Sequence, residues 1–321
     1  MKTIFCNRTY KGEMLDFLCS IIPEGFNLTS AVVGSSREEC LEKIRDADYL
    51  FATHELHVDA ELLNAAPKLK MVQRLGVGMD SVNLEAIKNR GIPLYINRGV
   101  NSRSVAELTV LLIMALARKL LMLDTTMRAN EWNRDYPSRR ELYGQTVGLI
   151  GFGNIASLVA ERIIPFGVKI LYHDIYRLSP EKEKKYNATY CEVDDLLKKS
   201  DIVSMHCMMD DKNCGMMNKE AFAKMKKGAL LVNTSRGGLV NEKDLAEAIL
   251  SGKLGGAALD VFNVEPLPQD SILRGLPNVI LTPHAGSGTL ESAKRMLSEG
   301  INNIIKFDAG DLDAIADRRI V

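Results

Sequence analysis

The chain has 321 residues, 46% hydrophobic and 26% charged, which is enough for two domains that each bury a core. Basic and acidic residues number 41 each without a long block of like charge, which argues against a nucleic-acid or anionic-membrane surface as the main function. The six cysteines are dispersed without a C-x-x-C pair, which predicts reduced thiols, a cytoplasmic protein and no metal site.

Neither the N-terminus nor the most hydrophobic stretch of the chain predicts a membrane protein. The N-terminal stretch is too short for a secretory signal and predicts a first strand instead. Residues 108–117 are bounded by Glu107 and Arg118 and are too short to cross a bilayer. We therefore expect a buried helix there and no contact with a membrane.

Residues 1 to about 98 have the pattern of a doubly wound parallel sheet, in which short apolar runs alternate with amphipathic segments. The expected strands cover residues 3–6, 31–33, 49–52, 71–74 and 93–96. The expected helices cover residues 13–22, 37–47, 59–65 and 84–89.

A glycine-containing loop, residues 75–80, follows the fourth of these strands. Gly76 and Gly78 would expose backbone N–H donors at a strand end, where open α/β sheets bind ligands. One interpretation is that Gly76, Val77 and Gly78 capture a small carboxylate. The other is an ordinary turn between a strand and a helix, and this segment alone does not separate the two.

A long apolar helix is expected from residue 105 through 116, with a pattern that extends toward Met127. Ser102 or Ser104 can cap its start. Because this helix is apolar nearly all round, it needs cover on most faces, and a second subunit could supply part of that cover. We interpret Trp132, the only tryptophan, as a packing anchor, with a wall of the substrate cleft as the alternative.

The centre of the chain carries a G-x-G-x-x-A motif, formed by Gly151, Gly153 and Ala156 after an apolar strand. A side chain at either glycine would keep a pyrophosphate away from the N–H groups at the start of the next helix. The motif alone is a weak signal. An expected helix at 157–166 and an expected strand at 168–172 give it the context of a dinucleotide-binding unit.

Asp174 comes at the end of that next strand, 21 residues after Gly153. An acid about 20 residues after the glycines binds the ribose hydroxyls of the adenosine in such units. Because a carboxylate there would repel a 2′-phosphate, we expect NAD(H) to be preferred over NADP(H). Arg177 is the competing signal, since its guanidinium could turn toward a phosphate.

The alternation of strands and helices continues beyond Asp174. Strands are expected at 202–206, 230–233, 255–261 and 279–281, and helices at 193–199, 219–225 and 242–251. Three of these strands are accompanied by side chains that could take part in catalysis. Arg236 follows the strand at 230–233, Asp260 and Glu265 accompany the strand at 255–261, and His284 follows the strand at 279–281.

Together these residue types could bind an anionic substrate and transfer a proton to or from it. A guanidinium can hold a carboxylate through two charge-assisted hydrogen bonds, and a histidine can move a proton near neutral pH. A glutamate beside the histidine raises its pKa. Each of these residues alone would usually be structural. Because they follow successive expected strands, we interpret them together as a catalytic site. His206 also ends a strand, and we expect it to be structural or to line the cofactor cleft.

The order of these motifs resembles the D-isomer-specific 2-hydroxyacid dehydrogenases over essentially the whole chain. The matching runs are 75–80, 105–107, Gly151-x-Gly153, 225–228, 232–233, 236–237, 259–262, 265–266 and 283–284. The resemblance implies an α/β protein with two doubly wound parallel-sheet domains and a cleft between them. A flavodoxin-like substrate domain would comprise 1–98 and 291–321, and an inserted Rossmann NAD-binding domain would comprise 99–290 and form a homodimer.

The resemblance also implies roles by matching position. Arg236 would bind the substrate carboxylate and carbonyl, and His284 would be the acid and base with Glu265 as its partner. Asn154 and Ile155 would meet the pyrophosphate, and Asp260 the nicotinamide carboxamide. The full set of expected NAD-binding residues is Gly151, Gly153, Asn154, Ile155, Asp174, Cys207, Thr234, Asp260, His284 and Gly286.

One departure from the family pattern follows His206. Many relatives have Cys or Thr, then Pro and Leu, after the matching histidine, whereas this chain has Cys207-Met208-Met209. We expect the missing proline to reshape the wall near the adenosine, while Cys207 still approaches it.

The substrate stays open between two kinds of acid. Arg74 and Arg134 resemble basic residues of the phosphoglycerate dehydrogenase branch, but the third arginine of that branch, expected near Thr53, is absent. Both 3-phosphohydroxypyruvate and small unphosphorylated acids such as glyoxylate or hydroxypyruvate remain candidates. The expected substrate-binding residues are Arg74, Gly76, Val77, Gly78, Arg134 and Arg236.

The predicted reaction is reversible hydride transfer between NADH and C2 of a small 2-oxo acid. Formate dehydrogenases share the fold but place glutamine where this chain has Glu265, because oxidation of formate needs no proton acceptor. The alternative from another class is an NAD(H)-sensing protein like the corepressors that resemble this family. Such a sensor would bind NADH without significant turnover.

Overall fold

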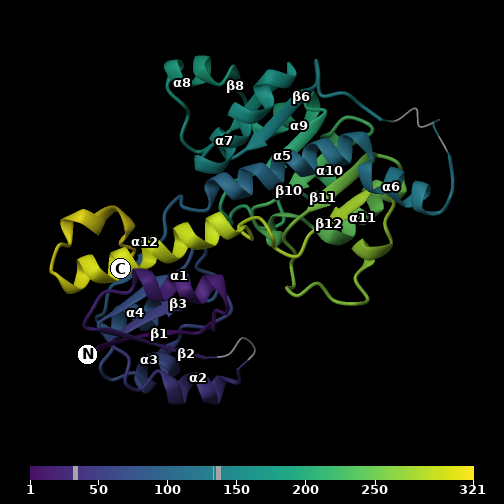
Figure 1. The fold of residues 1–321 in the computed structure, drawn as a ribbon. Coiled ribbons are helices and arrows are strands. Elements are labelled where there is room, and N and C mark those ends of the chain that lie inside the picture. The colour runs from purple at the N-terminus through teal and green to yellow at the C-terminus, as the bar shows by residue number, and fades with distance from the viewer. Residues whose placement is uncertain (32–34, 133, 135–138) are drawn as a thin grey trace. The chain divides into compact units, whose positions relative to one another are not determined.

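The computed structural model describes residues 1–31, 35–132, 134 and 139–321 (Figure 1). The chain divides into two compact units. Unit 1 comprises Met1–Asn101 and Thr289–Val321, and unit 2 comprises Ser102–Gly288. Both contain an entirely parallel sheet, as expected for two doubly wound domains.

Unit 1 has a five-stranded sheet in the order β2-β1-β3-β4-β5, which is the flavodoxin-like order. Its strands are β1 (Lys2–Cys6), β2 (Phe26–Ser30), β3 (Tyr49–Ala52), β4 (Met71–Arg74) and β5 (Leu94–Ile96). Its helices are α1 (Glu13–Ile21), α2 (Arg37–Lys43), α3 (Ala60–Ala65), α4 (Leu84–Arg90), α12 (Leu290–Asp308) and the 3-10 helix η4 (Asp313–Arg318). One apolar core lies between the sheet and α1 with α12, and a second lies between the sheet and α2, α3 and α4.

The second strand of unit 1 is not where we predicted it. The prediction placed it at 31–33, but the strand is Phe26–Ser30, and residues 32 and 33 lie outside the described part of the chain. The reason is its position at the edge of the sheet, where Phe26 and Leu28 alternate with polar residues. An apolar run, which marks a buried strand, is therefore missing from its sequence.

Unit 2 has a seven-stranded sheet in the order β12-β11-β10-β9-β6-β7-β8. The strands are β6 (Thr146–Ile150), β7 (Lys169–His173), β8 (Ala188–Tyr190), β9 (Ile202–Met205), β10 (Ala229–Asn233), β11 (Leu254–Leu259) and β12 (Val279–Leu281). Beginning at β6, the chain builds outward through β7 and β8 and then crosses to β9 on the other side. Open α/β sheets bind ligands beside the carboxyl ends of their strands at such a reversal.

Helices cover both faces of this second sheet. They are α5 (Ser102–Arg118), α6 (Leu120–Arg128), α7 (Asn154–Ile163), α8 (Pro180–Lys185), α9 (Val193–Lys199), α10 (Lys219–Lys224) and α11 (Glu242–Leu250). Three 3-10 helices are η1 (Ile164–Phe166), η2 (Gly237–Leu239) and η3 (Ile272–Gly275). The core on one face includes α5 and α7, and the core on the other includes α9, α10 and α11.

The long apolar helix differs from its prediction at both ends. Ser102 and Ser104 do not precede it as caps but lie in its first turn, where Ser104 Oγ donates a hydrogen bond to Gly286 O at 2.8 Å. The helix ends before Lys119, whose φ of +53° separates α5 from α6. Trp132 is 77% exposed, so its prediction as a packing anchor within this chain was wrong. Among the described residues, no helix is both long and apolar enough to span a bilayer.

Candidate functional site

The glycine turn after β6 has the geometry that a bound dinucleotide requires. Gly151 has a φ of +90°, and a Cβ there would lie 2.5 Å from Cys207 N, so a side chain is excluded by both conformation and space. A Cβ on Gly153 would meet no described atom within 4 Å, which leaves the approach to the start of α7 open. None of the described side chains caps α7, and its first turn carries no acid. The turn therefore fits a pyrophosphate.

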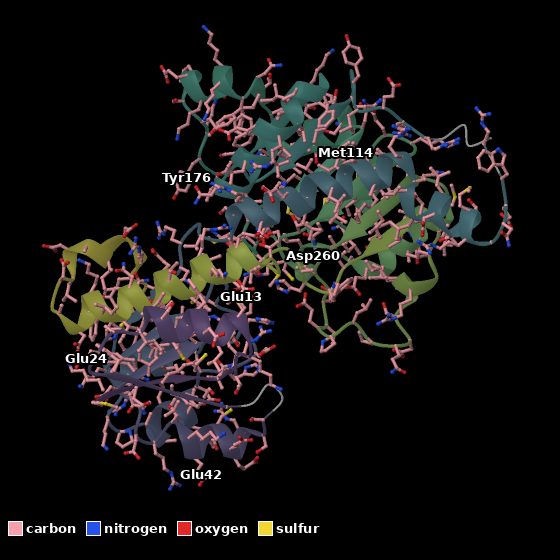
Figure 2. All side chains as sticks on the ribbon, in the orientation of Figure 1. Glu13, Glu24, Glu42, Met114, Tyr176 and Asp260 are labelled. Carbon is pink, nitrogen blue, oxygen red and sulfur yellow. The ribbon has the colours of Figure 1, made fainter. Side chains whose placement is uncertain are left out.

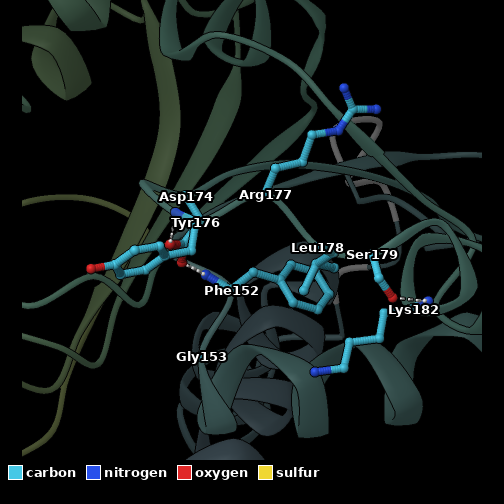
Figure 3. A pocket seen from close by; sticks show the side chains of 8 residues that line it. All are labelled: Phe152, Gly153, Asp174, Tyr176, Arg177, Leu178, Ser179 and Lys182. Carbon is cyan, nitrogen blue, oxygen red and sulfur yellow. Dashed lines mark hydrogen bonds between the residues drawn. The ribbon is translucent and has the colours of Figure 1, made fainter.

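Asp174 follows β7 and bridges two loops with its carboxylate. Oδ2 accepts a hydrogen bond from Phe152 N at 2.6 Å, and Oδ1 accepts one from Tyr176 N at 2.9 Å. It lies in a pocket of about 340 Å³ that also includes Gly153 (Figure 3). A carboxylate has about four lone-pair sites, so each oxygen keeps capacity to accept from a ribose hydroxyl. The role of Asp174 at the ribose stays a prediction.

Apart from Arg177, the other pocket residues were not predicted from the sequence, because most belong to the segment that leads into α8. The whole lining is Phe152, Gly153, Asp174, Tyr176, Arg177, Leu178, Ser179 and Lys182. Neither α8 nor β8 was predicted, since the helix sequence PEKEKK is polar and the strand has only three residues. Ser179 caps α8 and Pro180 is its first residue. This Ser-Pro pair is a helix-start signal that could have revealed the segment.

His284 and Glu265 form a close pair beyond β12 and β11. His284 Nδ1 lies 2.7 Å from Glu265 Oε2, and Glu265 Oε1 accepts a hydrogen bond from Phe262 N at 3.0 Å. The hydrogen bond to Glu265 raises the pKa of His284 above its usual value, and partial burial opposes the rise. His284 has a φ of +52°, an uncommon conformation for a residue with a Cβ, which the surrounding loop must hold in place.

Asp260 holds the loop that carries His284. It is only 1% exposed, and its Oδ1 accepts hydrogen bonds from Thr282 Oγ1 at 2.5 Å and Ala285 N at 2.8 Å. Its Oδ2 accepts one from Gly286 N at 2.8 Å, and its backbone O accepts one from His284 N at 2.8 Å. The negative charge of Asp260 also contributes to the raised pKa of His284. We predicted Asp260 at the nicotinamide, but we did not predict these hydrogen bonds within the loop.

Arg236 lies in the loop after β10, and Asn233 shapes that loop. Asn233 Nδ2 donates to Arg236 O at 2.8 Å, and Asn233 Oδ1 accepts from Ser235 N at 3.0 Å. The next residue must be glycine, because a Cβ on Gly237 would lie 2.0 Å from the Phe262 carbonyl. The charge of Arg236 lowers the pKa of His284, which opposes the effect of Glu265. The structure thus brings Arg236 close enough to the pair of His284 and Glu265 to influence its protonation.

Thr234 and Cys207, two further predicted cofactor residues, are held by hydrogen bonds within unit 2. Thr109 Oγ1 donates to Val105 O at 2.8 Å and lies 2.8 Å from Thr234 Oγ1, so Thr234 is the donor of that second bond. Ser235 Oγ donates to Cys207 O. Burial raises the pKa of Cys207 to about 11, which keeps it a neutral thiol at physiological pH.

His206 has a structural role in this arrangement. Its Nε2 lies 2.9 Å from Ser204 Oγ. Removal from solvent lowers the pKa of His206 to about 4, so the imidazole is neutral at physiological pH. It does not share the pairing with a carboxylate that distinguishes His284.

The remaining predicted substrate residues, which lie in unit 1 except for Arg134 of unit 2, differ in burial. Arg74 is 2% exposed, and its guanidinium donates to Gly78 O through Nε at 3.0 Å and to Thr53 O through Nη1. Gly76 has a φ of +102°, so the loop needs glycine there. Val77 and Arg134 are exposed. Arg74 thus braces the loop that Gly76 and Gly78 form.

Comparison with known proteins identifies the family. Residues 110–286 match the model of the D-isomer specific 2-hydroxyacid dehydrogenase, NAD binding domain. The chain belongs to this family. It is therefore an NAD-binding member of an oxidoreductase family that acts on 2-hydroxy acids.

Individual relatives agree in sequence and fold. The chain is 39% identical to the glyoxylate reductase of Thermofilum pendens, over 86% of this chain and 83% of that protein. It is 40% identical to the D-3-phosphoglycerate dehydrogenase of Mycobacterium tuberculosis over 82% of this chain, but spans only 50% of that protein's length. The crystal structure of D-lactate dehydrogenase from Aquifex aeolicus, complexed with NAD and lactic acid, superposes with a TM-score of 0.86 at 28% identity, covering 100% of this chain and 99% of that one.

Proposed function

We propose that this protein catalyses reversible hydride transfer between NADH and C2 of a small unphosphorylated 2-oxo acid such as glyoxylate or hydroxypyruvate. The observation that carries the proposal is the pair of His284 and Glu265, 2.7 Å apart, with the charge of Arg236 acting on it. The three residues follow β10, β11 and β12, which are neighbours in the sheet of the NAD-binding unit.

The cofactor supplies the hydride when it is bound, and the side chains supply the proton and the geometry. His284 Nδ1 faces Glu265, so we assign proton exchange with the substrate to Nε2. In reduction, the imidazolium donates to the carbonyl oxygen while Arg236 holds the carboxylate through its planar fork. In oxidation, the neutral imidazole takes the proton from the hydroxyl group.

The cofactor would occupy the carboxyl edge of the sheet of unit 2. Gly151, Gly153, Asn154 and Ile155 would hold the pyrophosphate, and Asp174 the adenosine ribose. The remaining contacts would come from Cys207, Thr234, Asp260, His284 and Gly286. The carboxylate of Asp174, in a pocket that borders Gly153, supports a preference for NAD(H) over NADP(H).

One observation favours an unphosphorylated substrate. The guanidinium of Arg74, one of the two arginines that suggested a phosphate, is buried against main-chain carbonyls. We propose that unit 1 serves as the substrate domain, with Gly76, Val77 and Gly78 binding the carboxylate. Arg134, which belongs to unit 2, would contribute a further cation.

We further propose that the protein is a cytoplasmic homodimer formed through unit 2. On α5, Leu111 is 56% exposed and Met114, labelled in Figure 2, is 37% exposed. On α6, Leu120, Leu121 and Met127 are each more than half exposed. Apolar side chains gathered on two consecutive helices support a surface that a second subunit covers. Sedimentation equilibrium should give twice the mass of the chain.

The test is loss of NADH absorbance with glyoxylate, hydroxypyruvate, pyruvate and 3-phosphohydroxypyruvate, beside an Arg236→Ala control. We expect strong turnover of glyoxylate or hydroxypyruvate that disappears in the control. Turnover of 3-phosphohydroxypyruvate alone would contradict the proposed substrate class. NADH binding without reduction of any acid would favour a sensor instead.

A further inference from the structure

In the pocket that Asp174 and Gly153 line, the side chain of Arg177 is held by a second carboxylate. Arg177 Nε donates to Glu183 Oε1 at 3.0 Å, and Arg177 Nη2 donates to Glu183 Oε2 at 3.4 Å. The guanidinium also lies over the ring of Tyr190, 5.4 Å from its centroid. In Figure 3, the guanidinium points away from Gly153 and from Lys182. Arg177 is therefore engaged on the side away from the glycine turn.

Glu183 is itself fixed by the core of unit 2. The hydroxyl group of Tyr172 donates to Glu183 Oε1 at 2.8 Å and accepts from Leu178 N at 3.0 Å. Tyr172 is fully buried, so its hydroxyl group is a fixed point. Glu183 thus accepts three hydrogen bonds, and two of them restrain one flexible arginine.

The position of Arg177 matters because of what NADP(H) adds to the ribose. Its 2′-phosphate is an anion, and Asp174 would repel it at the ribose site. A guanidinium is the usual partner of a phosphate, since it offers two parallel donors. Arg177 lines the same pocket as Asp174, so a rotation of its side chain would bring those donors into the pocket.

We propose that Glu183 is a specificity-determining residue that excludes NADP(H) by holding Arg177. Asp174 repels the 2′-phosphate, and Glu183 withholds the guanidinium of Arg177, which would attract it. This inference rests on the proposed preference for NAD(H), and it adds a second carboxylate that acts through Arg177 without touching the cofactor.

The experiment measures dissociation constants of NADH and NADPH by fluorescence titration, with Asp174→Asn as the background that removes the direct repulsion. Adding Glu183→Gln keeps an acceptor for Tyr172 and removes the charge that holds Arg177. We expect NADPH to bind about fivefold more tightly than in Asp174→Asn alone, with NADH binding unchanged. Adding Arg177→Ala to that pair should abolish the gain.

Glu181→Gln in the same background is the matched control. Glu181 lies two residues earlier in α8 and its substitution removes the same charge, but Glu181 makes no described contact with Arg177. The inference is overturned if Glu183→Gln leaves NADPH binding unchanged, if Glu181→Gln gives the same gain, or if the gain survives Arg177→Ala. Thermal unfolding of each variant confirms that the fold is intact.

This test reads cofactor binding and is independent of the proposed reaction. If no 2-oxo acid is reduced while NADPH binding depends on Glu183 and Arg177, the reaction is wrong and the inference stands. If glyoxylate is reduced while NADPH binding ignores both residues, the inference is wrong and the reaction stands.

Discussion

Arg236 in unit 2 and Arg74 in unit 1 occur in similar local sequences but differ in their surroundings. Each lies at or just beyond the end of a buried parallel strand and is followed closely by glycines. Arg236 is half-buried and its Nη1 donates to the neighbouring Ser235 O at 2.8 Å, but its charge also acts on His284. Arg74 is 2% exposed and donates to main-chain carbonyls of its own unit. A strand-end arginine therefore indicates a ligand site only where its charge also acts on a reactive group.

The largest effect on catalysis is expected at His284, whose pKa the charge of Arg236 lowers. Replacing His284 by alanine removes the proton donor, so kcat/KM for glyoxylate should fall by about 10²–10⁴. Steady-state kinetics with a thermal-unfolding control checks this. Turnover close to that of the unchanged protein, with the fold intact, would show that another group moves the proton.

The next largest effect is expected when Arg236 is replaced by lysine. Arg236→Lys keeps the charge but loses the planar fork, and kcat/KM should fall about 10- to 100-fold, which corresponds to the loss of one charge-assisted hydrogen bond. The melting temperature should stay within about 2 °C. An unchanged KM and kcat in this variant would remove Arg236 from the carboxylate site.

A smaller effect, on stability, is expected for Arg74→Lys. A lysine cannot donate to both Thr53 O and Gly78 O with the same geometry, so the free energy of unfolding should decrease by about 1–3 kcal/mol. Denaturant unfolding measures this, with the exposed Arg134→Lys as the matched control that should leave stability unchanged. A raised KM without any loss of stability would instead place Arg74 at the substrate.

Much of the fold was predictable because buried parallel strands are continuous apolar runs. The bounds of β3, β4 and β12 agree with those predicted from sequence, and both sheets are parallel as expected. The prediction was wrong for two strands at the sheet edges. We placed β2 at the wrong residues and did not predict β8, because edge strands are short or carry polar residues. The break at Lys119 was also hidden, because the apolar pattern continues across it.

The residues of the site were easier to foresee than their contacts. Strand-end position and residue type pointed to His284, Glu265 and Arg236, and the structure brings the three together. The same signals did not predict that Asp260 braces the loop of His284, because three of the four hydrogen bonds that Asp260 accepts come from main-chain N–H groups, which any sequence provides. The pairing of Arg177 with Glu183 was equally invisible, since it depends on the unpredicted helix α8.

The most direct test of the central claim is the pH dependence of kcat/KM for reduction of glyoxylate, in the unchanged protein and in Glu265→Gln. Reduction needs the imidazolium of His284. Glu265 and Asp260 raise its pKa and Arg236 lowers it, with Glu265 the largest cause. The rate should therefore be full at low pH and fall as the pH rises through a pKa above 6.5.

In Glu265→Gln the same fall should occur at lower pH, because the largest cause of the raised pKa is gone. Titration of the His284 ring by NMR in both proteins provides a second reading of the shift. A rate that falls at the same pH in both proteins would contradict the assignment of His284, tuned by Glu265, as the proton donor.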